Sequence, residues 1–261
     1  MTIISPDKIS GAEFKQLLEN YEPLINSISA SKGAKPGQKT LQELDGFRFV
    51  EAPALFSQDN PKRAMDHDDI KLLVDWKLRH GKFRPTLVKL VSSNDSSTAE
   101  ETVKDGIEAY HDASDLESAL KLLTKLKGIG PATASLLLSV HYPERVLFFS
   151  DEAYYWLCNK GQMASLKYNM KEYESLSVEA RKLMGRLSVS AMDVEKVAYV
   201  LLRQEGPLVR PTTNDTTSEI TKTKTETEKP QKPAVAKRKK ISEEVAESQV
   251  PLRRSKRGKA T

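Results

Sequence analysis

The spacing of apolar residues predicts helices along most of the first 205 residues. Near the N-terminus, apolar side chains recur at three- or four-residue intervals: Phe14, Leu17, Leu18, Tyr21 and Leu24. Helix breakers follow between Ser31 and Gly37, so the pattern predicts one amphipathic helix and a loop. A stronger pattern begins near Asp66 and ends at Gly81, and its predicted buried side is Ile70, Leu73, Val74 and Trp76.

Further helices are predicted over 96–110, from 114 to a Gly-Ile-Gly turn, from near 131, over 178–187 and over 193–204. An apolar run covers 87–91, and a polar stretch surrounds Lys167. Residues 41–49 fit either a helix or an extended piece, and 53–61 read as irregular. Because alternating apolar and polar runs are scarce, we expect an all-α domain of roughly eight to ten helices over residues 1–205.

Composition separates this domain from a tail over residues 206–261. The tail has few large apolar side chains and is rich in Thr, Lys, Glu, Pro and Ser, which predicts disorder. It contains 14 Lys and Arg against 7 Asp and Glu, whereas the whole chain has a formal net charge of +5. The domain is therefore near −2, and any nucleic-acid surface on it must come from local clustering.

Two tight basic clusters in the tail predict recognition by a nuclear import receptor, and hence a nuclear location. They consist of Lys237, Arg238, Lys239 and Lys240, and of Arg253, Arg254, Lys256 and Arg257. Such clusters would also add salt-sensitive affinity for DNA. A purely solubilising charge is the alternative interpretation.

Cysteine content and hydropathy exclude several classes of protein. The chain has one cysteine, Cys158, and 4 histidines, so an internal disulfide or a Cys-rich metal site is excluded and we expect neither metal nor cofactor. No run approaches ~18 apolar residues, and the N-terminus lacks a signal-peptide pattern. We expect an intracellular protein without a membrane span, acting as a monomer.

The segment from Leu126 to Leu157 contains the candidate binding and catalytic residues. Two glycines, Gly128 and Gly130, flank Ile129 between two helical patterns, and Pro131 suits the first turn of the second helix. Backbone N–H groups at that helix start lack intrahelical partners, which makes a phosphate site. The residues expected at a DNA backbone are Lys127, Gly128, Ile129, Gly130, Ala132 and Thr133. An ordinary turn between two helices is the alternative.

These residues resemble a helix-hairpin-helix, and residues 126–160 are similar to the corresponding part of the helix-hairpin-helix DNA glycosylase superfamily. An apolar connection, Val146-Leu-Phe-Phe-Ser150, leads to Asp151 at the position of that family's aspartate. The Gly-Lys-Phe-Arg-Pro loop at 81–85 and the last predicted helix also resemble the eukaryotic Amun-like branch. The resemblance implies an all-α glycosylase-like fold, double-stranded DNA as the partner, and a role in DNA repair.

Two departures from the family pattern bear on the activity. The family's bifunctional lyases carry a lysine two positions after the second hairpin glycine, and Ala132 stands there. The resemblance therefore implies a monofunctional N-glycosylase without a Schiff-base amine at that position. The histidine that often follows the aspartate by two residues is replaced by Ala153.

Base excision needs a carboxylate that stabilises an oxocarbenium-like sugar and orients water, together with a pocket for the flipped base. Asp151 is the predicted carboxylate, and Glu152 is the alternative. Tyr154, Tyr155 and Trp156 are candidate pocket aromatics, although three consecutive residues cannot all face one side of a helix. Asp151 could instead serve as a helix cap.

Two functions therefore stay open at this point. The first is a nuclear DNA N-glycosylase of the helix-hairpin-helix type that uses Asp151. The second is a catalytically inactive module that uses the same fold to bind DNA or chromatin proteins.

Overall fold

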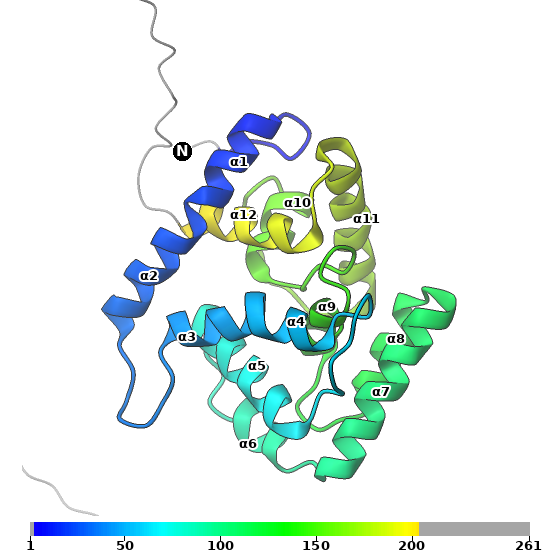
Figure 1. The fold of residues 1–261 in the computed structure, drawn as a ribbon. Helices are drawn as coiled ribbons and strands as arrows, with labels where there is room; N and C mark the ends of the chain where they lie inside the picture. The colour runs from blue at the N-terminus through cyan, green and yellow to red at the C-terminus, as the bar shows by residue number, and fades with distance from the viewer. Residues whose placement is uncertain (1–2, 204–261) are drawn as a thin grey trace, which may run out of the picture. The chain divides into compact units, whose positions relative to one another are not determined.

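The computed structural model describes residues 3–203, and these are all-helical, without a strand (Figure 1). The helices are α1 (Gly11–Glu19), α2 (Tyr21–Lys32), α3 (Leu41–Gly46), the π-helical turn η1 (Phe47–Glu51), α4 (Ala52–Phe56), α5 (His67–His80), α6 (Leu87–Ser92), α7 (Ser96–Ala113), α8 (Leu116–Leu123), α9 (Pro131–His141), α10 (Asp151–Cys158), α11 (Met170–Leu187) and α12 (Ala191–Arg203). The all-α expectation is thereby confirmed. The predicted tail and both basic clusters lie outside the described residues.

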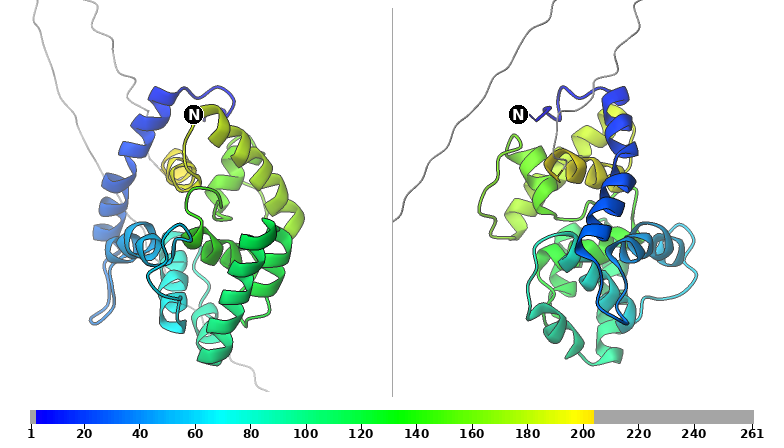
Figure 2. Two further views of the ribbon diagram at one scale, coloured as in Figure 1. Left: turned by 45° about the vertical axis from the view of Figure 1, so that its right-hand side comes forward. Right: turned by 90° about the vertical axis from the view of Figure 1, so that its left-hand side faces the viewer.

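The helices form two groups that divide along the chain. Helices from both ends of the described range, α1, α2 and α10 to α12, pack together, and the middle helices α3 to α9 pack with one another. Figure 2 shows α12 end-on, with α1 and α2 to one side and α10 and α11 to the other. The last helix is therefore the centre of the terminal group.

Two segments differ from the sequence prediction, and the first difference has a proline as its cause. The first predicted helix is two helices, α1 and α2, which meet at Asn20. In a continuous helix the ring of Pro23 would clash with the carbonyl of Glu19. Residues 41–56, left open or read as irregular, are helical throughout, and Pro53 lies just after a π turn in which the Ala52 N–H donates to the Phe47 carbonyl.

Side-chain caps fix the starts of several helices. Asp66 caps α5 through a capping box with Asp69, and Asp115, not Ser114, caps α8. Helix α11 starts at Met170, eight residues before the predicted start, because Asn169 and Glu172 also form a capping box. The polar composition near Lys167 hid this start.

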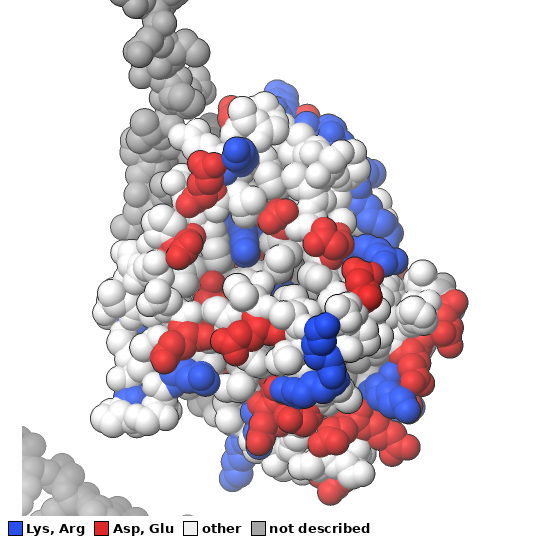
Figure 3. All heavy atoms as spheres, in the orientation of Figure 1, with Lys and Arg blue, Asp and Glu red and all other residues white. Residues whose placement is uncertain are grey.

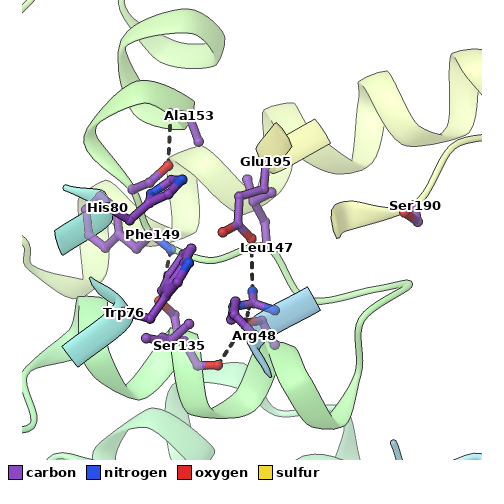
Figure 4. A network of polar contacts seen from close by, with 12 residues as sticks. Arg48, Trp76, His80, Ser135, Leu147, Phe149, Ala153, Ser190 and Glu195 are labelled. Atoms are coloured by element: carbon purple, nitrogen blue, oxygen red, sulfur yellow. Dashed lines mark hydrogen bonds and ion pairs between the residues drawn. The ribbon is translucent and has the colours of Figure 1, made fainter. Parts of the chain in front are cut away.

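A buried ion pair joins the two helix groups. Arg48 of η1 donates from Nη2 to Glu195 Oε2 of α12 at 3.0 Å and to Ser139 Oγ of α9 at 2.8 Å (Figure 4). Both charged side chains are almost fully buried, at 1% and 2% exposure. The Arg48 guanidinium also lies over the Trp76 ring, 5.3 Å from its centroid. The boundary between the groups thus contains a polar contact within apolar packing.

Candidate active site

A pocket lies where the two helix groups meet. From the middle group it is lined by Lys77, Gly81, Arg84 and Ala132, and from the terminal group by Asp151, Glu152, Tyr168 and Arg203. Its volume is about 40 Å³, which is room for a few water molecules. Five segments of the chain therefore build one site around the predicted carboxylate.

Asp151 is not the cap of its helix. Ser150 is the N-cap of α10, and its Oγ accepts a hydrogen bond from the Ala153 N–H at 3.1 Å. Asp151 is the first residue inside the helix, so its carboxylate is free to face the pocket that it lines. The sequence left open that Asp151 caps the helix; in the structure Ser150 is the cap.

The extended connection before α10 is tied to its neighbours. Ser135 of α9 accepts a hydrogen bond from the Phe149 N–H at 2.9 Å (Figure 4). The Tyr173 hydroxyl donates to the Leu147 carbonyl at 2.7 Å. Ser135 and Tyr173 are fully buried. These bonds satisfy connection groups that have no sheet partner, and they fix the position from which Asp151 projects.

Tyr168 covers the Asp151 carboxylate. Its hydroxyl donates to Asp151 Oδ1 at 2.6 Å, while its ring lies 5.6 Å from the Phe149 ring and 5.3 Å from the Arg84 guanidinium carbon. Burial, followed by this hydrogen bond, raises the pKa of Tyr168, so the phenol keeps its proton. The backbone of Tyr168 has φ of 54°, a left-handed conformation that costs a non-glycine residue about 1 kcal/mol or more.

Glu152, the alternative carboxylate, is already paired. Arg203 of α12 donates from Nε to Glu152 Oε1 at 2.7 Å, and its Nη2 forms an ion pair with the same oxygen at 2.6 Å. The Glu152 side chain is 6% exposed, whereas Asp151 is half-buried. The geometry thus favours Asp151 as the group that can meet a ligand.

Cationic side chains surround the pocket on the side of α5. Lys77 is half-buried, and Lys82 and Arg84 are exposed on the loop that follows the helix. Burial and the charge of Arg84 lower the pKa of Lys77 to about 8, against the opposing influence of Asp151. Phosphate groups on either side of a bound nucleotide would find charge complementarity here.

The hairpin is fixed against α6. Gly128 has φ of 79°, and a side chain there would meet Leu90 and Val91 at 3.0 Å, so glycine is required. Asn94 clamps the preceding residue: its Oδ1 accepts from the Lys127 N–H at 2.8 Å and its Nδ2 donates to the Lys127 carbonyl at 3.0 Å. Sequence reasoning missed Asn94, which no local motif marks.

The predicted DNA-contacting residues fall into an outer and an inner set. Lys127 and Gly130 are exposed, and Gly128 is half-exposed. Ile129, Ala132 and Thr133 are buried, so only their backbone groups or edges could meet DNA. The N–H groups of Gly128, Gly130 and Ala132 donate to no group among residues 3–203. The open turn therefore presents unpaired donors, as a phosphate site requires.

The three consecutive aromatics do not line the pocket. Trp156 is 1% exposed and donates from Nε1 to the Ile4 carbonyl at 2.8 Å, so it belongs to the core. The Tyr155 hydroxyl donates to the Ala164 carbonyl at 2.9 Å, and Tyr154 packs against Phe149. Helical geometry turns these side chains away from Asp151. The aromatic side chain that lies at the carboxylate is instead Tyr168, which comes from the next loop.

Acidic side chains gather elsewhere on the surface. In the view of Figure 3 they lie over α7 and the start of α8. The exposed carboxylates of α7 are Glu100, Glu101, Asp105, Glu108 and Asp112. This face would repel an anionic partner such as a nucleic-acid backbone.

Within residues 3–203 no group of three or more His, Cys, Asp or Glu side chains is arranged to hold a metal ion. No helix in the same range has the length and apolar character to cross a membrane. Comparison with known proteins finds no matching family model, curated protein or solved structure.

Proposed function

We propose that the chain is a DNA N-glycosylase of the helix-hairpin-helix type, with Asp151 as its carboxylate. One observation carries the proposal: the Asp151 carboxylate is released from capping by Ser150 and lines the same pocket as Ala132, in the first turn of the hairpin helix. The carboxylate thus lies in one pocket with the first turn of the helix that follows the predicted phosphate-binding turn. That is the arrangement that base excision needs.

In this mechanism the nucleotide is flipped out of the duplex and its sugar comes to rest beside Asp151. The carboxylate stabilises the positive charge that develops on the sugar as the bond to the base breaks, and it orients the attacking water. The hairpin N–H groups and the cations near α5 hold the flanking phosphates. Arg203 keeps Glu152 in its ion pair, so a single carboxylate acts.

The pocket has to open for this reaction. A volume of about 40 Å³ admits water but not a nucleobase, and the Tyr168 hydroxyl occupies Asp151 Oδ1. Withdrawal of Tyr168 from the carboxylate is therefore the first step. The loop between α10 and α11, which contains Tyr168, has the strained backbone that suits such a movement.

The proposal is tested with duplexes that carry uracil, alkylated, oxidised and mismatched bases, in which abasic sites are counted after incubation. We expect release from at least one duplex and loss of that release in Asp151→Asn, which can still accept the Tyr168 hydrogen bond. Asp105→Asn, which removes one exposed carboxylate of α7, is the matched control and should keep full activity. Retained binding without release from any duplex would instead identify the inactive DNA-binding module.

We also propose a nuclear location, which rests on the two basic clusters of the tail. A fluorescent fusion of the full chain should concentrate in nuclei. Replacement of the four residues 237–240 and the four basic residues between 253 and 257 by alanine should distribute it through the cell. An unchanged distribution would leave the clusters with a solubilising role.

A further inference from the structure

Lys77 places a primary amine in the wall of the Asp151 pocket. It comes from α5, one turn before the end of the helix, and it shares the pocket with Asp151 and Ala132. Ala132 stands where the resemblance would require a lysine for lyase chemistry. The pocket therefore contains an amine that comes from a different helix.

The surroundings of Lys77 suit a nucleophile more than a structural cation. Its ammonium group makes no hydrogen bond and no ion pair with any residue of 3–203, although the side chain is half-buried. Burial, with Arg84, lowers the pKa of Lys77 from 10.5 to about 8. About a tenth of the amine is thus unprotonated at pH 7, far more than for an ordinary lysine, and only the unprotonated amine attacks carbon.

We propose that Lys77 Nζ is the nucleophile of an abasic-site lyase step in the Asp151 pocket. The inference rests on the proposed function for its substrate, the abasic deoxyribose within duplex DNA. It replaces the expectation of a monofunctional enzyme, which depended on Ala132 alone.

The step balances with water as the only co-reactant. Lys77 Nζ adds to C1′ of the ring-opened sugar, and loss of water gives an iminium. Asp151 takes the proton from C2′, and the electron pair of that C–H bond expels the 3′ phosphate as the C3′–O bond breaks. Water then hydrolyses the iminium, which releases an unsaturated aldehyde on the 5′ fragment and restores Lys77.

Other amines near the site are less suited. Lys82 also lines the pocket but is exposed on the loop after α5, and Lys127 is exposed on the hairpin turn. Among the lysines of residues 3–203, Lys77 alone combines pocket lining with partial burial. Lys182, which is exposed on α11 and lies outside the pocket lining, is the matched control.

The test uses the full chain and a duplex with a preformed abasic site, so that base excision is not needed. Cyanoborohydride reduces an iminium to a stable amine, and we expect a covalent protein–DNA adduct whose modified peptide contains Lys77. Lys77→Arg keeps the charge and should lose the adduct while binding intact duplex as before. Lys182→Arg should keep the adduct, and strand cleavage by the unmodified chain should increase as pH rises from 6 towards 8.

An adduct that maps to Lys82, Lys127 or the tail, or that persists in Lys77→Arg, would overturn the inference, as would the absence of an adduct. Identification of the modified peptide in the unmodified chain tests the inference even if Lys77→Arg folds poorly. Any of these results would leave the proposed base release by Asp151 uncontradicted, because that reaction is measured separately. An adduct at Lys77 without base release from any duplex would instead reject the glycosylase and leave a lyase.

Discussion

The Tyr168 hydroxyl donates a 2.6 Å hydrogen bond to the Asp151 carboxylate across 17 positions of sequence. A phenol thus occupies the carboxylate oxygen that base excision would use. Because the bond is partly buried and its acceptor is charged, it contributes to the closed state of the pocket. The bond therefore bears on substrate entry.

Tyr168→Phe should speed base release when opening limits the rate, because it removes the donor and keeps the ring. A lost hydrogen bond of about 1 kcal/mol corresponds to a rate increase of roughly fivefold. Single-turnover release from the best duplex measures this effect. Tyr155→Phe removes a hydroxyl that bonds to the Ala164 carbonyl instead, and it should leave the rate unchanged. Loss of release in Tyr168→Phe would show that the hydroxyl takes part in the chemistry.

Gly130→Glu should weaken DNA binding without unfolding the chain. Gly130 is exposed, and a side chain added there meets no atom within 4 Å, so the substitution fits. A carboxylate beside the free N–H groups repels the phosphate, and the slope of log affinity against log salt should fall by about one contact. Fluorescence anisotropy at several salt concentrations measures both quantities.

Gly185→Glu is the control for this experiment, because Gly185 is also exposed and open but lies on α11. Equal loss of affinity in both variants would point to net charge. No loss in either would place the DNA away from the hairpin, and the hairpin would then serve protein contacts or packing alone.

The Arg48–Glu195 pair should be more sensitive to single than to double replacement. Glu195→Gln leaves a buried guanidinium without its counter-charge and should lower the free energy of unfolding by about 3–5 kcal/mol. Arg48→Met with Glu195→Leu removes both charges, together with two buried atoms, Arg48 Nε and Glu195 Oε1, that have no hydrogen-bond partner. The double variant should therefore be close to the unmodified chain in urea denaturation. Additive losses would contradict this account.

Stability should fall in acid because of His141. This residue is buried, donates from Nδ1 to the Leu137 carbonyl at 2.7 Å, and stacks on Phe56. Burial lowers the pKa of His141 from 6.5 to about 4, so between these values the unfolded chain binds a proton that the folded chain excludes. The contribution of His141 to the free energy of unfolding is fully present above pH 6.5. About 3 kcal/mol of it is lost as pH falls towards 4.

Urea denaturation at intervals between pH 7 and 4 measures this loss. His141→Asn should make the profile less steep over that range, although buried His80, whose pKa is also lowered by burial, still contributes. His111→Asn, on the exposed face of α7, should not change the profile. A profile that is equally steep in His141→Asn would assign the acid sensitivity to other groups.

The sequence predicted those parts of the fold that depend on residues close together in the chain. The start of α5 at Asp66, its buried face and the hairpin turn at Gly128 were all readable from spacing, caps and glycine. The break at Asn20 was missed, because one continuous helix was predicted across Pro23. The early start of α11 was missed because its capping box lies in a polar stretch.

The pocket could be predicted only in part. Asp151 was identified through its resemblance to a family position, but Tyr168, Arg203 and Lys77 come from three other segments. Their convergence depends on tertiary packing, which no periodicity encodes. The choice between Asp151 and Ser150 as the cap was equally invisible, because both residue types cap helices well.

The position of α12 has a consequence for the order of synthesis. Arg203, the last described residue, pairs with Glu152 in the pocket wall, and α12 packs on α1 and α2 from the other end of the chain. A nascent chain still lacking α12 cannot close the terminal helix group, so the site forms only after the whole domain has left the ribosome. Emerging domains would thus have the hairpin before they have a working carboxylate pocket.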